Sequence, residues 1–163
     1  METKNFDTAP LTHEQAETEP KVQLFAYGEK SNIGRVPEGS QKPHTENEDS
    51  YLIDKQKGLF IVCDGVGGLS AGAIASREVA QYLAEHLPEN PSDLSLSELV
   101  ENIDDEYKNA HQVLKDLMQT RPELGKMATT ASVVQLWNGP NGERKAVLAN
   151  IGDSRIYYLS AEG

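Results

Sequence analysis

The segment Leu59–Ser76, Leu-Phe-Ile-Val-Cys-Asp-Gly-Val-Gly-Gly-Leu-Ser-Ala-Gly-Ala-Ile-Ala-Ser, carries the strongest structural signal in this 163-residue chain. Its first five residues form a continuous apolar run, which predicts a strand buried on both faces. Asp64 follows at the end of the run, and a glycine-rich loop extends from there to Gly72. A carboxylate at the rim of a core is costly to bury unless it is paired or binds a metal. The glycines allow tight turning and expose carbonyls, which are good ligands for hard cations, although an ordinary Asp-Gly turn explains the same residues equally well.

Two helices are predicted after this segment. Apolar residues at helical spacing indicate a first helix over 73–87, which Pro88 ends. Ser95 or Ser97 can cap a second helix that runs to about Thr120. The apolar stripes of these helices are expected to lie in the core: Val79, Tyr82, Leu83, Leu87, Leu99, Ile103, Tyr107, Ala110, Leu114 and Leu117.

Short strands are predicted on both sides of the helices. The strand patterns fall at 22–27, 50–54, 59–63, 129–137, 144–151 and 155–159. Residues 55–58 and Asn138–Gly142 are turn sequences that would join strands as hairpins. Helices placed between hairpin-joined strands indicate an α+β fold with mainly antiparallel strands.

Composition narrows the class of protein. The net charge of -11 argues against a nucleic-acid partner and against an anionic membrane surface. No apolar run is long enough for a membrane span, and the polar N-terminus lacks the features of a signal peptide. The single cysteine, Cys63, excludes an internal disulfide. We therefore expect a cytoplasmic monomer with a disordered acidic lead-in over residues 1–20.

Two more acidic motifs stand beside strands. Asn47-Glu48-Asp49 precedes one strand, and adjacent carboxylates on extended backbone point to opposite faces. Asp153 follows another strand within Gly152-Asp153-Ser154-Arg155. Taken singly, these motifs fit a solvated loop and a type I turn. Together with Asp64 they can converge on one edge of the fold, where oxygen ligands suit Mg²⁺ or Mn²⁺ and a pair of such ions can hydrolyse phosphoesters.

Four ordered motifs resemble the metal-dependent protein serine/threonine phosphatases of type 2C, the PPM family. They are Asn47-Glu48-Asp49, the apolar strand with Asp64-Gly-Val-Gly-Gly68, Ala128-Thr-Thr-Ala131, and Ala149-Asn-Ile-Gly-Asp-Ser-Arg155. The resemblance covers about 22–163. It implies that residues 21–163 are the N-terminal part of a phosphatase catalytic domain. The implied fold is an αββα sandwich of two mainly antiparallel β-sheets flanked by helices, C-terminally incomplete in this chain.

The resemblance also implies roles for individual residues. Asp64 would bridge two Mn²⁺ or Mg²⁺ ions, and Glu48 and the carbonyl of Gly65 would bind one of them. Asp49 would be a hydrogen-bonding carboxylate that completes the catalytic set with Asp64 and Glu48. Asp153 would belong to a third, weaker metal site found in some relatives. The substrates would be phosphoserine and phosphothreonine in proteins, hydrolysed by metal-activated water.

Two departures from the family pattern matter. The family usually has a phosphate-binding Arg three residues before the Asn, where this chain has His44, which can hold phosphate only when protonated. Arg35 and Lys42 are other candidates for that role. The further strands and metal-binding aspartates of the family do not occur in these 163 residues. We therefore expect the chain alone to bind metal weakly, to hydrolyse phosphate poorly and to expose apolar sheet surface.

Three alternatives compete with this interpretation. Gly68-Leu69-Ser70-Ala71-Gly72 matches the Gly-x-Ser-x-Gly pattern of serine hydrolases, but the predicted strand ends too early, and His86 and His111 fall in helices. A dinucleotide-binding loop would need glycine where Ser70 stands. The third alternative is a truncated, non-catalytic phosphatase-like binding or regulatory domain, which His44 and the absent aspartates favour.

Overall fold

The computed structural model describes residues 28–31, 47–67 and 70–160. Its elements in chain order are β1 Asp49–Asp54, β2 Leu59–Gly67, α1 Ala71–His86, η2 Pro91–Asp93, α2 Leu96–Thr120, η3 Pro122–Leu124, β3 Met127–Thr129, β4 Ala131–Asn138 and β5 Arg144–Ile151. The expected strand at 22–27 lies outside the described residues. The expected strand at 144–151 is confirmed as β5, and the expected helices are confirmed with shifts of one or two residues.

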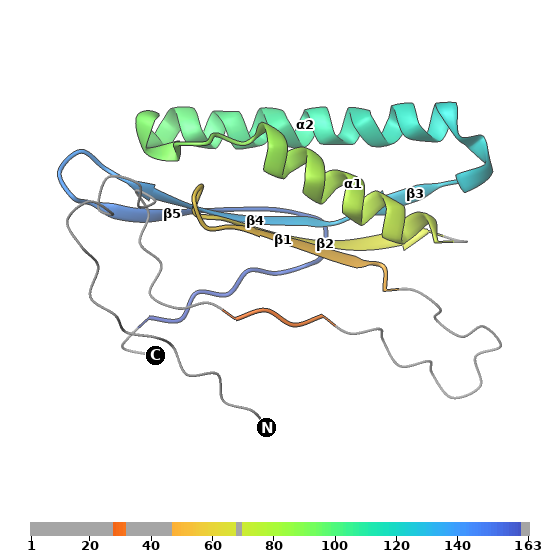
Figure 1. Ribbon diagram of the computed structural model, residues 1–163, viewed down its shortest axis with the longest axis horizontal. Coiled ribbons are helices and arrows are strands. Elements are labelled where there is room, and N and C mark those ends of the chain that lie inside the picture. Colours follow the sequence, from red (N-terminus) through yellow and green to blue (C-terminus); the bar gives the residue numbers. More distant parts are fainter. Residues whose placement is uncertain (1–27, 32–46, 68–69, 161–163) are drawn as a thin grey trace, which may run out of the picture.

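One antiparallel sheet forms the floor of the fold. Its five strands follow the order β1-β2-β4-β5, and β3 pairs with the last residues of β2. Hairpins join β1 to β2 and β4 to β5, as the turn sequences predict. Figure 1 shows α1 and α2 together on one face of this sheet. The α+β class with mainly antiparallel strands and flanking helices is therefore confirmed.

Local sequence explains where the helices begin and end. The Ser95 side chain accepts from the Glu98 N–H while the Glu98 carboxylate accepts from the Ser95 N–H, which makes a capping box at the start of α2. α1 ends where the Leu87 N–H donates to the Leu83 carbonyl, just before Pro88.

The core lies between the helices and the sheet face that they cover. The Tyr107 hydroxyl lies 3.2 and 3.0 Å from the carbonyls of Ala131 and Ala149 and shares its single hydrogen between them, which ties α2 to β4 and β5. The residues of the predicted stripes that are buried are Val79, Leu83, Leu87, Leu99, Ile103, Tyr107, Ala110 and Leu114. Tyr82 and Leu117 are half-buried at the edge of this core.

Several expectations about strands were wrong. β2 runs through Gly67 instead of ending at Cys63, because residues 65–67 pair with β3. The range 129–137 is two strands that are interrupted at Thr130. Residues 155–159 form no strand. The apolar run in β2 is not buried on both faces, because helices cover one face only and Val62 is 52% exposed.

The sheet face away from the helices exposes several large apolar side chains. Tyr51, Val62 and Leu148 lie on three different strands and are 45%, 52% and 49% exposed. The described residues contain one sheet and one helical layer, and a second sheet of the expected sandwich is not among them. Neither α1 nor α2 is at once long and apolar enough to cross a membrane.

Candidate active site

Two carboxylates meet where β1 begins. Strand register pairs Asp49 directly with Asp64, and the buried neighbours Cys63 and Gly65 turn Asp64 toward the face away from the helices. Partial burial, followed by the charge of Asp64 and a hydrogen bond with it, raises the pKa of Asp49. Like charges directly opposite each other in a sheet are destabilising, so this pair favours a position beside a cation.

Glu48 lies on the other side of the backbone, against the start of α1. Its carbonyl accepts the Gly65 N–H at 3.0 Å. A Cβ at Gly72 would lie 2.9 Å from the Glu48 carboxyl carbon, and a Cβ at Gly65 would run into the Gly72 carbonyl. The two glycines thus let the strand, the helix and the Glu48 carboxylate approach closely. The first turn of a helix also favours a nearby negative charge.

Two threonines hold the backbone of Asp64 from the neighbouring strand. The Thr130 N–H and the Thr129 hydroxyl donate to the Asp64 carbonyl, at 2.8 and 3.0 Å, and the Asp64 N–H donates to the Thr130 hydroxyl at 3.0 Å. The Thr130 hydroxyl also lies 2.8 Å from that of Ser154, in the turn that follows β5. This contact brings the turn that carries Asp153 next to the Asp64 strand.

The sequence-predicted site residues are only partly brought together. Glu48, Asp49, Asp64 and Gly65 adjoin one another, and Asp153 is exposed on the neighbouring turn. The sequence predicted that Asp64 follows the end of a strand, but the structure places it within β2. His44, like Arg35 and Lys42, falls outside the described residues.

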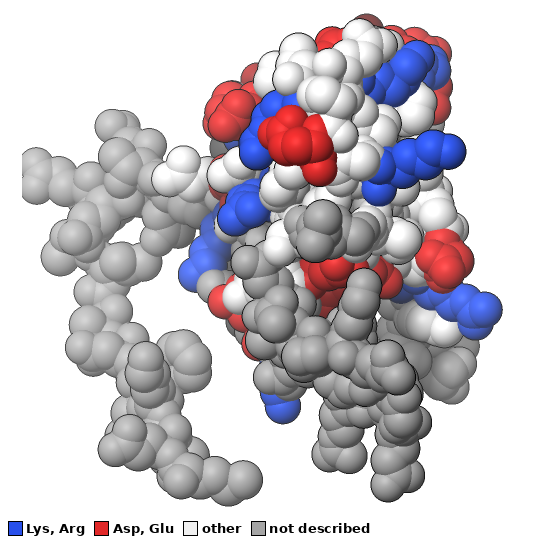
Figure 2. Space-filling view, turned by 90° about the vertical axis from the view of Figure 1, so that its right-hand side faces the viewer, with Lys and Arg blue, Asp and Glu red and all other residues white. Residues whose placement is uncertain are grey.

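The donor chemistry of these residues suits a hard cation. The groups at this end of the sheet are carboxylates and a backbone carbonyl, which are ligands of Mg²⁺ and Mn²⁺. Among the described residues, no three His, Cys, Asp or Glu side chains converge on a point where they could hold a metal ion. Figure 2 views the end of the molecule where β1 begins and β2 ends, and acidic side chains gather near the middle of that face.

The competing serine site receives little support from the geometry. Ser70 is the N-cap residue of α1 and has a left-handed backbone, with φ 65°. Within the described part of the chain, no hydrogen bond joins its side chain to a histidine, and His86 Nδ1 instead lies 2.8 Å from the Tyr82 carbonyl. A nucleophile of this kind needs an adjacent base.

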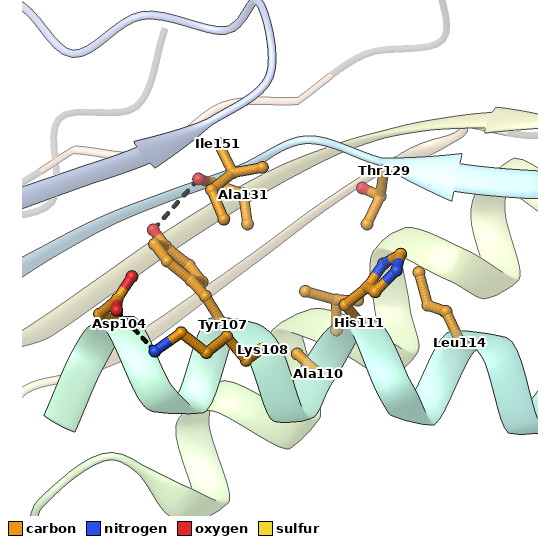
Figure 3. Close-up of a pocket in the computed structure, with 10 residues that line it drawn as sticks. Asp104, Tyr107, Lys108, Ala110, His111, Leu114, Thr129, Ala131 and Ile151 are labelled. Carbon is orange, nitrogen blue, oxygen red and sulfur yellow. Dashed lines mark hydrogen bonds and ion pairs between the residues drawn. The ribbon is translucent and has the colours of Figure 1, made fainter. Parts of the chain in front are cut away.

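A separate cavity of about 340 Å³ lies between α2 and the strand ends (Figure 3). Its walls are mainly apolar, with Leu114 and Ile151 among them. Among the polar side chains drawn there, Lys108 pairs with Asp104 and Tyr107 bonds to the Ala131 carbonyl, whereas His111 has no interaction drawn. Thr129 lines the cavity and bonds to the Asp64 carbonyl, so the cavity adjoins the back of the acidic site.

Residues 40–163 match the family described as Protein phosphatase 2C. The chain belongs to this family. The serine/threonine phosphatase stp of Listeria innocua is 26% identical over 126 residues, which are 77% of this chain and 48% of the relative. The chain therefore spans about half the length of this relative. The proteins related to it in this way are protein serine/threonine phosphatases.

Solved structures of type 2C phosphatases share the fold. The serine/threonine phosphatase PstP/Ppp of Mycobacterium tuberculosis has a TM-score of 0.61 and 28% identity, over 77% of this chain and 46% of that chain. The catalytic domain of PstP in complex with two manganese ions has a TM-score of 0.51 and 24% identity, over 72% of this chain and 52% of that chain. The helical layer on an antiparallel sheet is therefore the architecture of this family.

Proposed function

We propose that this chain is the N-terminal part, residues 21–163, of the catalytic domain of a metal-dependent protein serine/threonine phosphatase. The substrates are phosphoserine and phosphothreonine side chains of proteins. The observation that carries the proposal is the direct pairing of Asp49 with Asp64, beside Glu48. A pair of carboxylates this close together is unfavourable without a cation. The chain also belongs to a family whose relatives are protein serine/threonine phosphatases.

Each acidic residue has a proposed role. Asp64 would bind two Mn²⁺ or Mg²⁺ ions, and Glu48 and the Gly65 carbonyl would bind one of them. Asp49 would accept a hydrogen bond next to Asp64, and Asp153 would hold a third, weaker ion. Bound ions of this kind lower the pKa of water and neutralise phosphoryl oxygens. The two manganese ions of the PstP catalytic domain support the choice of metal.

The chain's own residues would arrange the site. The Asp49–Asp64 pair presents its negative charge on the exposed face of β1 and β2, where a phosphoprotein can reach it. Glu48 is fixed against α1 by the close approach of Gly72. His44 would bind the substrate phosphate in its protonated form.

The test is phosphate release from a phosphothreonine peptide, with and without Mn²⁺, by the protein purified from its own source. The intact mass of that protein is measured first and compared with the 17.9 kDa of this chain. The comparison establishes which polypeptide the assay is testing. We expect Mn²⁺-dependent release that Asp64→Asn abolishes. Asp105→Asn is the matched control, because it removes an exposed carboxylate of α2 that, among the described residues, pairs only with Lys108 at the surface.

Each outcome has a defined meaning. Activity that survives Asp64→Asn would disprove the proposed site. Binding of Mn²⁺ without phosphate release would favour the non-catalytic alternative. The 163-residue chain by itself should bind Mn²⁺ weakly and release little phosphate, and rapid Mn²⁺-dependent turnover by it would contradict that expectation.

A further inference from the structure

Thr130 occupies the single position at which the sheet beside Asp64 is interrupted. Val62 pairs with Ser132 in β4, and Gly65 pairs with Thr129 in β3. Both pairs belong to the same register, which places Thr130 opposite Asp64. β3 ends at Thr129 and β4 begins at Ala131, so Thr130 alone separates the two strands.

The interruption exchanges one backbone hydrogen bond for a side-chain bond. In a hydrogen-bonded antiparallel pair, each residue gives its N–H to the carbonyl of the other. The Thr130 N–H does donate to the Asp64 carbonyl at 2.8 Å, but the Asp64 N–H donates to the Thr130 hydroxyl at 3.0 Å. The Thr130 carbonyl lies 2.9 Å from the Thr129 hydroxyl, whose single hydrogen it shares with the Asp64 carbonyl. The strand therefore opens at the residue opposite Asp64.

The same hydroxyl reaches the turn after β5. Because it accepts from Asp64, its own hydrogen can be donated to the Ser154 hydroxyl, 2.8 Å away. Gly152 has φ 103°, and a Cβ there would lie 2.7 Å from the Thr130 methyl group, so the turn packs closely on this side chain. Thr130 is only 7% exposed, so water competes little for these bonds.

We propose that Thr130 is a positioning residue for the metal site, whose hydroxyl fixes the Asp64 backbone and the turn that carries Asp153 relative to each other. This inference rests on the proposed function. Groups that orient metal ligands typically contribute 10- to 100-fold to metal affinity, so losing the hydroxyl should cost about tenfold. A valine at this position keeps the branched shape and the backbone bond but cannot bridge the two segments.

The experiment compares four variants of the full chain with the unaltered protein. Thr130→Val removes the hydroxyl, Thr130→Ser keeps it, and Ser154→Ala removes its partner in the turn. Ser132→Ala is the matched control, since Ser132 lies two residues further along the chain, in β4, and donates to Asn150 Oδ1 at 2.6 Å and not to Asp64. Mn²⁺ affinity is measured by isothermal titration calorimetry, and exchange of the Asp64 amide is measured by NMR on the metal-free protein.

Thr130→Val should bind Mn²⁺ about tenfold more weakly and should exchange the Asp64 amide faster. Thr130→Ser and Ser132→Ala should match the unaltered chain in both measurements. Ser154→Ala should weaken Mn²⁺ binding about fivefold, the equivalent of one ordinary hydrogen bond. If Thr130→Val does not fold, Ser154→Ala decides the question, and unchanged affinity in that variant would overturn the proposal.

Equal losses of affinity in Thr130→Val and Ser132→Ala would also overturn it, because they would indicate general damage to β4. Failure of the unaltered natural protein to bind Mn²⁺ would count against the proposed function. The hold of the Thr130 hydroxyl on the Asp64 backbone is tested separately in the metal-free protein. Unchanged exchange of the Asp64 amide in Thr130→Val would refute that hold.

Discussion

A buried lysine in the turn between β1 and β2 caps the C-terminal end of α1. Lys57 is 4% exposed, and its ammonium group donates to the carbonyls of Ala84 and Leu87, at 2.6 and 3.2 Å. It also lies 3.0 Å from a carboxylate oxygen of Glu89. The Ala84 carbonyl would ordinarily accept from residue 88, but Pro88 has no N–H. Lys57 therefore supplies the donor that proline removes from the helix.

We expect Lys57→Met to lower the free energy of unfolding by about 2–3 kcal/mol. A hydrogen bond from a charged donor contributes about 1.5–3 kcal/mol. In this variant the carbonyls of Ala84 and Leu87 each lose such a hydrogen bond. Part of this loss is offset, because methionine fills a similar volume without the cost of burying an ammonium group. The Glu89 contact adds little, since the Glu89 side chain is 76% exposed and surface pairs contribute about 0–1 kcal/mol.

Urea unfolding followed by fluorescence of the single tryptophan measures this loss. Trp137 is 7% exposed and its indole N–H donates to the Leu94 carbonyl, so its emission should report loss of the core. The melting temperature should fall by about 4–12 °C, at about 2–4 °C per kcal/mol for a chain of this size. Glu89→Gln is the control and should change stability by less than about 1 kcal/mol. If Lys57→Met is no more destabilising than Glu89→Gln, the capping argument is wrong.

Three further predictions concern the acidic site and the core. Asp49→Asn should raise the unfolding free energy of the metal-free chain by about 0.2–1 kcal/mol, because it removes the charge opposite Asp64. The same variant should bind Mn²⁺ more weakly. Equal or lower stability of the metal-free variant would contradict the proposed repulsion between the two carboxylates. Gly72→Ala should lower the free energy of unfolding, because its Cβ would lie 3.0 Å from the Gly65 carbonyl carbon, and it should bind Mn²⁺ about tenfold more weakly as the same Cβ displaces the Glu48 carboxyl group; unchanged affinity by calorimetry would exclude that displacement. Burial raises the pKa of the Cys63 thiol from 9.0 to about 12, so the neutral thiol stabilises the fold fully below pH 9 and progressively less as pH rises toward 12. Cys63→Ala should therefore reduce the dependence of the unfolding free energy on pH between 9 and 12. A disulfide reagent at pH 8 should react with Cys63 only as fast as the protein unfolds.

The sequence predicted those elements for which local signals and packing agree. The Ser95 cap, the helical stripe from Leu99 to Leu114 and the hairpin at Asn138–Gly142 all appear in the structure. In each case the pattern, the capping residue and the turn residues favour the same local conformation, so little depends on distant contacts. The pairing of Asp49 with Asp64 was not predicted, because register depends on the hairpin as a whole.

The errors arise where tertiary contacts override local pattern. Gly65 and Gly67 resemble a loop in sequence, but β3 pairs with them and extends β2. Lys57 resembles a surface lysine, and only the neighbouring Pro88 hints that a carbonyl nearby lacks a donor. The break at Thr130 is invisible in a threonine- and valine-rich run, because it depends on the residue opposite. Propensity describes a segment, and these three features belong to pairs of segments.

The contacts around Asp64 suggest why a metal-free site of this kind can remain in one conformation. The repulsion between Asp49 and Asp64 favours separation of β1 from β2, whereas three hydrogen bonds with Thr129 and Thr130 hold the Asp64 backbone on its other side. An unfavourable arrangement persists only where its surroundings over-determine it. The affinity for a cation and the instability of the metal-free chain should therefore have one common origin, since a bound cation relieves the repulsion that the threonines resist. It follows that changes at Asp49 should move metal-free stability and Mn²⁺ affinity in opposite directions, whereas loss of the Thr130 hydroxyl should lower both.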